Sequence, residues 1–446
     1  MKISKLLLLG MVLSVISAHA QQPTTLSLND AVAMALSKSD EVKLANTKAV
    51  TRRYDLESVK NNRYPDVKIS GQYLRLANAD INLKSTQEAT SDPNATPPAS
   101  PKVNQLMLGQ ANVTMPLFSG FKLKNSMLAS EKLYEAELAN ADYTREEIAM
   151  RVIQYYAELY KVQKSVELFT ESLKSGQQRV TDFQAMEQNG LIARNDLLKS
   201  QLQLSRYQLS LDEAQKNIRI LSFALNTLLK LPLDTQIIVN PDNIDKDLFS
   251  KTVKTEAEAL QLRKDLIALG FTQEAAEANI KVAKSNYFPS VSLVGGYTAL
   301  DLQNVVRVEN AMNVGVGLSY NLSSIFKNSK DVNAAKSRAL EVNQQQLILT
   351  DRIKMEIVGA REEYELAVKQ DLVYQEAVGQ ADENYRIVKD KYDNGLSDTN
   401  DLLEADVEDL SAKINQAYAK ANLVLKYYKL LDASGQLTQS FNFTKK

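Results

Sequence analysis

The chain has 446 residues, of which 44% are hydrophobic and 24% are charged, as is usual for a folded protein. Lys and Arg total 53 against 54 Asp and Glu, so the charge balance gives no reason to expect a nucleic-acid partner. There is no Cys, no Trp and one His, which excludes disulfides, thiolate metal sites and Cys nucleophiles. We therefore expect no metal site, no cofactor and no enzyme activity.

Residues 1–20 have the features of a signal peptide. Lys2 and Lys5 form a basic start, an apolar run follows over residues 6–16, and an A-x-A cleavage site ends at Ala20. The alternative, a membrane anchor, is disfavoured because a spanning helix needs about 20 apolar residues. Cleavage predicts an exported mature chain with no His, with 51 basic against 54 acidic residues, and with no Cys for N-terminal lipidation.

Long segments rich in Ala, Leu, Glu, Lys and Gln carry apolar residues at spacings of three and four. One such row runs over residues 152–173, and others lie at 204–228, 357–392 and 403–424. A sustained 3.5-residue repeat predicts helices that pack as left-handed coiled coils. A single helix over residues 120–188 would be about 100 Å long at 1.5 Å per residue, which exceeds the size of a globular domain.

The sequence contains an internal duplication. Matching segments are Tyr64-Pro65 with Phe288-Pro289, Asn189-Gly190-Leu191 with Asn394-Gly395-Leu396, and the capping boxes Ser27-x-x-Asp30 with Thr255-x-x-Glu258. Each half is predicted to form a helix, two strands, a long helix, a tip and a returning helix. The predicted divisions are a signal peptide (1–20), a first half with its tip near 190 (21–231), a connector (232–254), a second half with its tip near 395 (255–435) and a C-terminal tail (436–446).

Four strands are predicted at about 66–77, 106–117, 290–300 and 311–321. The fourth is the clearest, because apolar residues from Met312 to Tyr320 alternate with small or polar ones, whereas the alternation is weak over 108–115. Such strands suit a tilted crossing of an outer membrane, and two soluble hairpins packed on helices are the alternative. Four strands do not close a barrel around a water-filled pore, so the membrane interpretation requires several copies.

These features occur in the same order in both halves of the chain. Together they resemble those of TolC-like outer-membrane efflux proteins, the outer-membrane factors of tripartite export systems. Nearly all of the mature chain takes part in the resemblance, which also rests on residues 27–36, 115–120 and 262–266. The resemblance implies a fold that is mainly α with a β-barrel part. Three chains of four strands would form one 12-stranded transmembrane β-barrel in outer-membrane lipid, continued into the periplasm by a long coiled-coil α-barrel.

The same resemblance implies a function and partners. A homotrimer of this family is a passive channel for small molecules or polypeptides, and it works with a periplasmic adaptor (membrane fusion) protein and an inner-membrane pump. The alternative is a periplasmic or surface coiled-coil tether without channel activity.

The resemblance also places a site at the periplasmic tips. The positions of the family's acidic ring, which selects cations, correspond to Asp401 and Glu404. The alternative is that these two acids only complement the positive end of the helix dipole at the start of a helix. The family residues whose contacts hold the tips closed correspond to Asp196 and Ser397. The family has an Arg at the position of Ser397, and Arg194 is a nearby substitute for that Arg. The adaptor would contact the two tips, whose glycines also suit purely structural turns: Asn189, Gly190, Leu191, Asn394, Gly395 and Leu396.

Overall fold

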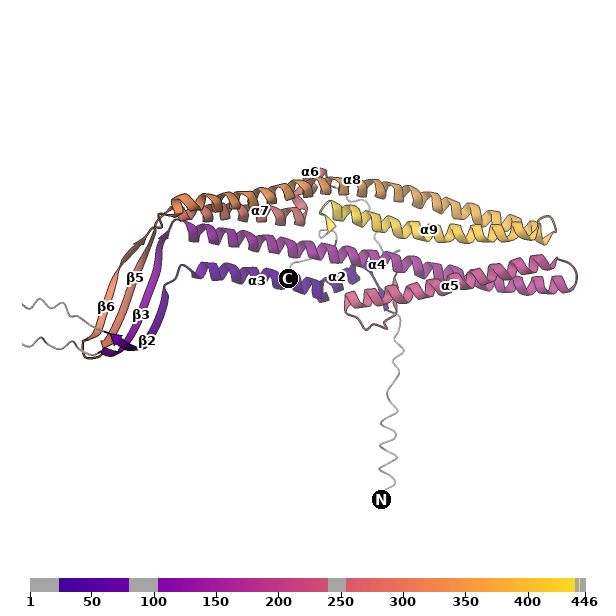
Figure 1. The fold of residues 1–446 in the computed structure, drawn as a ribbon. Coiled ribbons are helices and arrows are strands. Elements are labelled where there is room, and N and C mark those ends of the chain that lie inside the picture. The colour runs from indigo at the N-terminus through magenta and orange to yellow at the C-terminus, as the bar shows by residue number, and fades with distance from the viewer. Residues whose placement is uncertain (1–23, 80–102, 240–253, 438–440, 442–446) are drawn as a thin grey trace, which may run out of the picture. The chain divides into compact units, whose positions relative to one another are not determined.

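The computed structural model describes residues 24–79, 103–239, 254–437 and 441. The predicted signal peptide, most of the predicted connector and most of the C-terminal tail lie outside these residues. The described residues form two compact units: unit 1 takes in those within 1–48, 138–268 and 346–446, and unit 2 takes in those within 49–137 and 269–345. The predicted fold class, mainly helical with four long strands, is confirmed (Figure 1).

Four helices that contain no proline contribute to both units. They are α3 (Asp40–Asn61), α4 (Lys122–Gln188), α7 (Lys264–Lys284) and α8 (Ser324–Asp393). The α4 helix has 67 residues and α8 has 70, in agreement with the uninterrupted helix predicted over 120–188. Within the described ranges, no helix is both long enough and apolar enough to cross a membrane.

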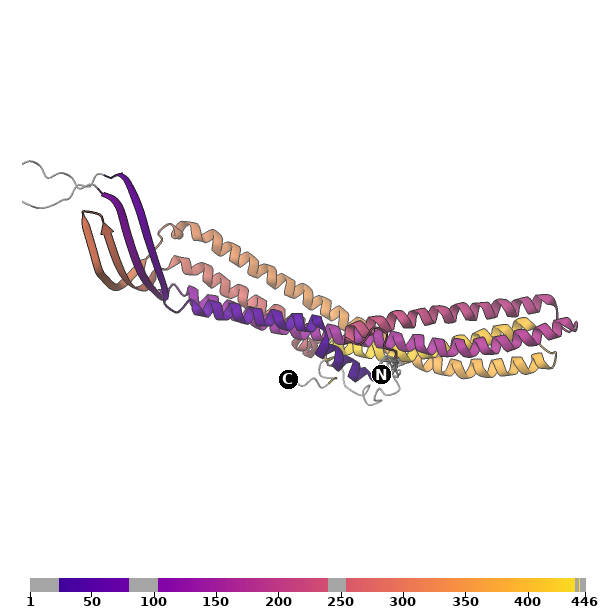
Figure 2. The same cartoon turned by 90° about the horizontal axis from the view of Figure 1, so that it is seen from below.

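Unit 2 contains an antiparallel sheet of four strands in the order β2-β3-β5-β6 (Figure 2). The strands are β2 (Asp66–Ala79), β3 (Val103–Ser119), β5 (Ser290–Leu302) and β6 (Val306–Ser319). Each half of the sequence supplies one hairpin, and β3 pairs with β5 to join the two hairpins. The β3–β5 register shifts between Pro116 and Phe118, where a proline has no N–H to donate to the ladder.

The register gives this sheet one apolar and one polar face. One row across the four strands joins Ile69, Ala111, Tyr297 and Met312, and the next row on the same face joins Val67, Val113, Gly295 and Val314. Between them, on the opposite face, lies the row Lys68, Asn112, Gly296 and Asn313. Ile69 is 81% exposed and Val314 is 83% exposed in the single chain, so the described residues of one chain leave the apolar face uncovered at both edge strands.

Unit 1 is built on two antiparallel helix pairs. The α5 helix (Arg194–Leu229) returns along α4, and α9 (Thr399–Ala433) returns along α8 (Figure 1). The short helices α2 (Leu28–Lys38) and α6 (Glu256–Leu262) begin the two halves. Two three-residue strands, β1 (Thr24–Leu26) and β4 (Ile237–Val239), pair in parallel, so the beginning of the first half lies beside the segment that follows its last helix.

Both predicted N-caps are present. Thr255 and Glu258 form a complete capping box, and the hydrogen bonds from Thr255 and Lys254 lower the pKa of Glu258 to about 2. Ser27 accepts a hydrogen bond from the backbone N–H of Asp30 at 3.1 Å. These bonds satisfy amide groups that have no partner inside a helix, and they fix where each half begins.

The core of unit 1 collects apolar side chains from α2, α4, α5 and α9. Val152 and Leu159, from the predicted apolar row of α4, are fully buried, and Leu225 of α5 and Tyr427 of α9 pack in the same cluster. The Tyr156 hydroxyl donates to the Leu26 carbonyl at 2.9 Å, and the Gln163 amide donates to the Ile237 carbonyl at 2.6 Å. The middle of α4 therefore holds both short strands in place.

Candidate functional site at the helical tips

The two tips have the same backbone geometry, as their matching sequences suggest. Gly190 and Gly395 adopt φ angles of +72° and +70°, a left-handed conformation that side chains disfavour. In each tip the glycine N–H bonds to a carbonyl three residues back and the next leucine N–H bonds to a carbonyl five residues back, at 2.8–2.9 Å. This is the Schellman ending of a helix, so both glycines are required by the turn itself.

The leucine after each glycine points away from the protein. Leu191 is 71% exposed and Leu396 is 78% exposed. The preceding asparagines also match, because Asn189 donates its side-chain amide to the Ala185 carbonyl and Asn394 donates to the Asp390 carbonyl, both at 2.7 Å. Each helix pair therefore ends in a polar turn that presents one solvent-exposed leucine.

The predicted ring residues lie on one exposed face at the start of α9. Asp401 accepts a hydrogen bond from the Ser397 hydroxyl at 2.7 Å, and Glu404 lies three residues further along the same face. Both carboxylates are exposed in the single chain, and Glu408 continues the exposed row one turn later. Glu408 is not among the predicted site residues, although its i+4 spacing from Glu404 is visible in the sequence.

Asp398, rather than Asp401, is the residue that caps α9. Its carboxylate accepts from the backbone N–H groups of Asn400 at 2.7 Å and Asp401 at 3.1 Å, and these bonds lower the pKa of Asp398. Asp398 therefore supplies the N-cap of α9, and Asp401 lies in the first turn of the helix, where an acidic side chain also complements the positive end of the helix dipole.

The structure does not bring Arg194 and Asp196 together within the chain. Arg194 pairs with Glu187 of α4 at 3.3 Å, while Asp196 lies 3.9 Å from Lys199. Lys199 in turn donates to the Asn400 side-chain oxygen at 2.7 Å and so links the start of α5 to the start of α9.

An apolar cluster packs the two hairpins together behind the tips. Phe183, Leu197 and Leu402 are buried there, and Phe183 stacks on Tyr392 with ring centroids 5.8 Å apart. Tyr385 packs on the same cluster. One turn deeper, Arg179 of α4 and Asp406 of α9 form a buried ion pair that the sequence reasoning missed.

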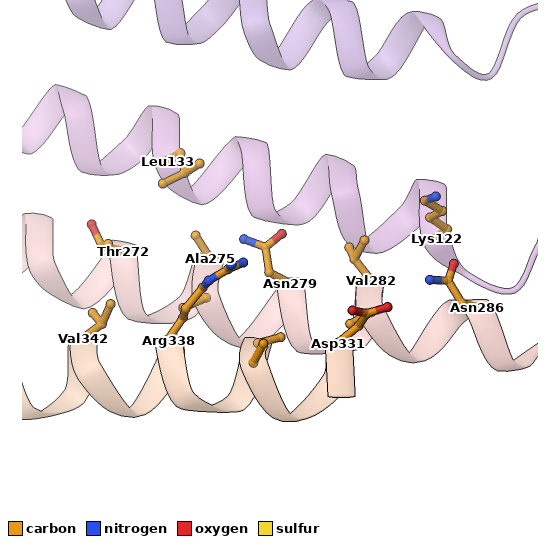
Figure 3. A pocket seen from close by; sticks show the side chains of 14 residues that line it. Lys122, Leu133, Thr272, Ala275, Asn279, Val282, Asn286, Asp331, Arg338 and Val342 are labelled. Carbon is orange, nitrogen blue, oxygen red and sulfur yellow. The ribbon is translucent and has the colours of Figure 1, made fainter. Parts of the chain in front are cut away.

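A second feature of the described chain, away from the tips, is a groove. A groove of about 590 Å³ lies in unit 2 between α4, α7 and α8 (Figure 3), and five of its fourteen lining residues are alanines. Charged side chains such as Lys122, Asp331 and Arg338 line it as well, but none of the predicted site residues does. Among the described residues no group of three or more His, Asp or Glu is placed to hold a metal ion.

Comparisons with known proteins agree with this architecture. A family model described as outer membrane efflux protein matches residues 31–229 and 257–436. The outer membrane efflux protein BepC of Brucella suis is 19% identical over 394 residues, which are 88% of this chain and 85% of BepC. Among solved structures, the outer-membrane channel OprN has a TM-score of 0.77 at 19% identity, covering 92% of this chain and 90% of its own. VceC of Vibrio cholerae has a TM-score of 0.76 at 18% identity, covering 92% and 96%.

Proposed function

Because the chain belongs to the outer membrane efflux protein family, whose members are outer-membrane channels of tripartite efflux systems, we propose that three copies assemble into one passive duct. In this assembly the protein supplies the path and the inner-membrane pump supplies the energy. The duct has no catalytic role and needs no cofactor.

The single observation that carries the proposal is the two-faced sheet with open edges. A continuous apolar face across four strands is costly in water and favourable in lipid. Backbone groups at the open edges of β2 and β6 must also be paired inside a membrane, because lipid offers no hydrogen bonds. Three copies joined edge to edge, β6 of one to β2 of the next, give a closed 12-stranded barrel whose polar face lines the pore.

The tips form the regulated end of the proposed duct. Threefold symmetry would repeat Asp401 and Glu404 as two stacked rings of carboxylates, which attract cations and repel anions. Asp196, Arg194 and Ser397 contribute to tip contacts in the closed state. Ser397 acts by holding the Asp401 carboxylate, and Arg194 and Asp196 would exchange their partners within the chain, Glu187 and Lys199, for partners in neighbouring chains.

The exposed leucines support the two tips as the surface that the periplasmic adaptor binds. Leu191 and Leu396 stand out from two turns of identical geometry, so an adaptor can recognise both in the same way. Asn189, Gly190, Asn394 and Gly395 form the rest of this surface. The mature protein lies in the outer membrane and extends into the periplasm after signal-peptide cleavage, without N-terminal lipid.

The assembly and the ring are tested separately. The full-length protein, purified from outer membranes, should run as a heat-labile trimer and conduct ions in planar bilayers. Asp401→Ala with Glu404→Ala should reduce its cation selectivity, because the ring charge is lost. The matched control is Asp212→Ala with Glu213→Ala, which removes the same charge from the exposed surface of α5.

Three outcomes would contradict parts of this proposal. A soluble, elongated monomer in the periplasmic fraction would favour a structural tether over a channel. A conducting trimer whose selectivity is the same in the ring variant and in the wild type would refute the ring assignment alone. Equal loss of selectivity in the control variant would show that surface charge in general, rather than the ring, sets selectivity.

A further inference from the structure

A buried ion pair joins the two helical hairpins of unit 1 behind the tips. The Arg179 guanidinium on α4 donates to both carboxylate oxygens of Asp406 on α9, each at 2.9 Å. The side chains are only 9% and 13% exposed. A bidentate ion pair of this kind is directional as well as strong, so it fixes the orientation of α9 against α4.

Two tyrosines from the remaining helices complete the cluster. The Tyr207 hydroxyl on α5 donates to Asp406 Oδ2 at 2.7 Å, and Arg179 also donates to the Tyr385 hydroxyl on α8 at 3.3 Å. Burial and the neighbouring Asp406 charge raise the pKa of Tyr207, which keeps its hydroxyl a donor. The helices α4, α5, α8 and α9 therefore each contribute one side chain to this polar cluster.

A glycine lies beside this cluster. Gly176, one turn before Arg179, is the only glycine in α4. A Cβ at this position would lie 3.3 Å from Leu204 Cδ1 and 3.6 Å from the Tyr207 ring. The bare backbone at position 176 therefore lets α5 pack closely against α4 next to Tyr207.

The cluster lies close to the proposed ring on the same helix. Leu402, one turn from Asp406 toward the tip, is buried among Phe183 and Leu197 of the first hairpin, whereas Asp401 and Glu404 occupy the exposed face of that turn. Because Asp406 is held against α4, the rotation of α9 about its axis and its position along that axis are also set for the turn that carries Asp401 and Glu404.

Sliding one hairpin along the other at this point would leave both charges without partners while the site stays buried. A buried ion pair with one partner removed is strongly destabilising, because the remaining charge has lost both water and its counter-ion. Two helices can shift along each other while an apolar contact such as that of Phe183 with Tyr392 is kept. The same shift breaks a bidentate ion pair.

We propose that Arg179 and Asp406 are positioning residues that hold the Asp401 and Glu404 carboxylates in a fixed place relative to the α4–α5 hairpin. The inference rests on the proposed channel function in its last step. Any movement that widens the constriction must then carry both hairpins of a chain together or break this pair.

The coupling of the hairpins is tested without reference to conduction. Because the chain has no Cys, spin labels can be placed at Leu191→Cys and Leu396→Cys, one on each tip. Labelled chains are diluted with unlabelled ones so that each assembly contains one labelled chain. The distance distribution should be narrow in the otherwise wild-type protein and broad in Arg179→Met and in Asp406→Asn.

Three further variants show whether the ion pair itself is responsible. The exchange Arg179→Asp with Asp406→Arg should restore a narrow distribution, and Tyr207→Phe should broaden it only partly. Arg386→Met is the matched control, because Arg386 of α8 is exposed and, among the described residues, forms its ion pairs within its own helix, with Glu383 and Asp390. A narrow distribution in Arg179→Met, or broadening that the exchange does not reverse, would overturn the proposal.

Bilayer recordings test the link to the ring. Arg179→Met should raise closed-state conductance and keep the preference for cations, whereas Asp401→Ala with Glu404→Ala should lose the preference. Broadened tip distances with unchanged conductance would refute the positioning role and leave the channel intact. If no variant, including the wild type, conducts, the proposed channel fails while the distance measurement still decides whether the pair couples the hairpins.

Discussion

Replacing Asp432 with Asn should stabilise the protein at neutral pH and have no effect in acid. Asp432 lies near the end of α9, close to Arg263, whose side chain is only 8% exposed. The Arg263 guanidinium already donates to both oxygens of Asp265, at 3.0 and 2.7 Å, and to Glu356 at 3.0 Å. Its charge is therefore balanced by two carboxylates, and a third one at Asp432 is in excess.

The sign of the effect follows from the pKa. Burial raises the pKa of Asp432 from 3.8 to about 6; Arg263 opposes this shift, and the charges of Glu356, Asp265 and Glu147 reinforce it. Since the pKa is higher in the folded than in the unfolded state, the neutral carboxyl stabilises the fold. That contribution is complete below about pH 4 and is lost as the pH rises through about 6.

A difference of about two pKa units corresponds to about 3 kcal/mol at most. Because Asp432 is only partly buried, we expect about 1–2 kcal/mol for Asp432→Asn at pH 7.5. The measurement is the thermal midpoint of the purified protein by circular dichroism from pH 4 to 8, with Asp351→Asn, an exposed position on α8, as the control. Destabilisation by Asp432→Asn at pH 7.5 would show that Arg263 needs this third carboxylate, and an equal gain at pH 4 would rule out the titration.

Two other substitutions probe the same unit and the sheet. Arg263→Ala should destabilise the protein by about 3–5 kcal/mol, because it leaves the largely buried Asp265 carboxylate without its cation; the denaturation midpoint measures this, and a change below 1 kcal/mol would contradict it. Val314→Arg should reduce the yield of assembled trimer, because a cation on a lipid-facing strand costs about 2–4 kcal/mol near the membrane centre. Asn313→Arg, on the polar face, is the control, and trimer yields that fall equally for both would contradict the assignment of faces.

The sequence was sufficient for features that depend on neighbours along the chain. The 3.5-residue rows predicted the long helices, since a coiled-coil face depends only on local spacing. The Asn-Gly-Leu tips and the Thr255 capping box are also local, because their hydrogen bonds join residues no more than five apart. The clear alternation over 311–321 predicted β6, although the strand begins earlier, at Val306.

Tertiary structure decided what joins distant segments. The alternation of β3 is weak, yet β3 is a central strand, because its place is set by pairing with β2 on one side and with β5 on the other. Arg179 and Asp406 are 227 residues apart, and neither departs from the pattern of a surface helix in the sequence. Only the packing of four helices removes both side chains from water, and it is this loss of water that turns two ordinary charges into a fixed contact.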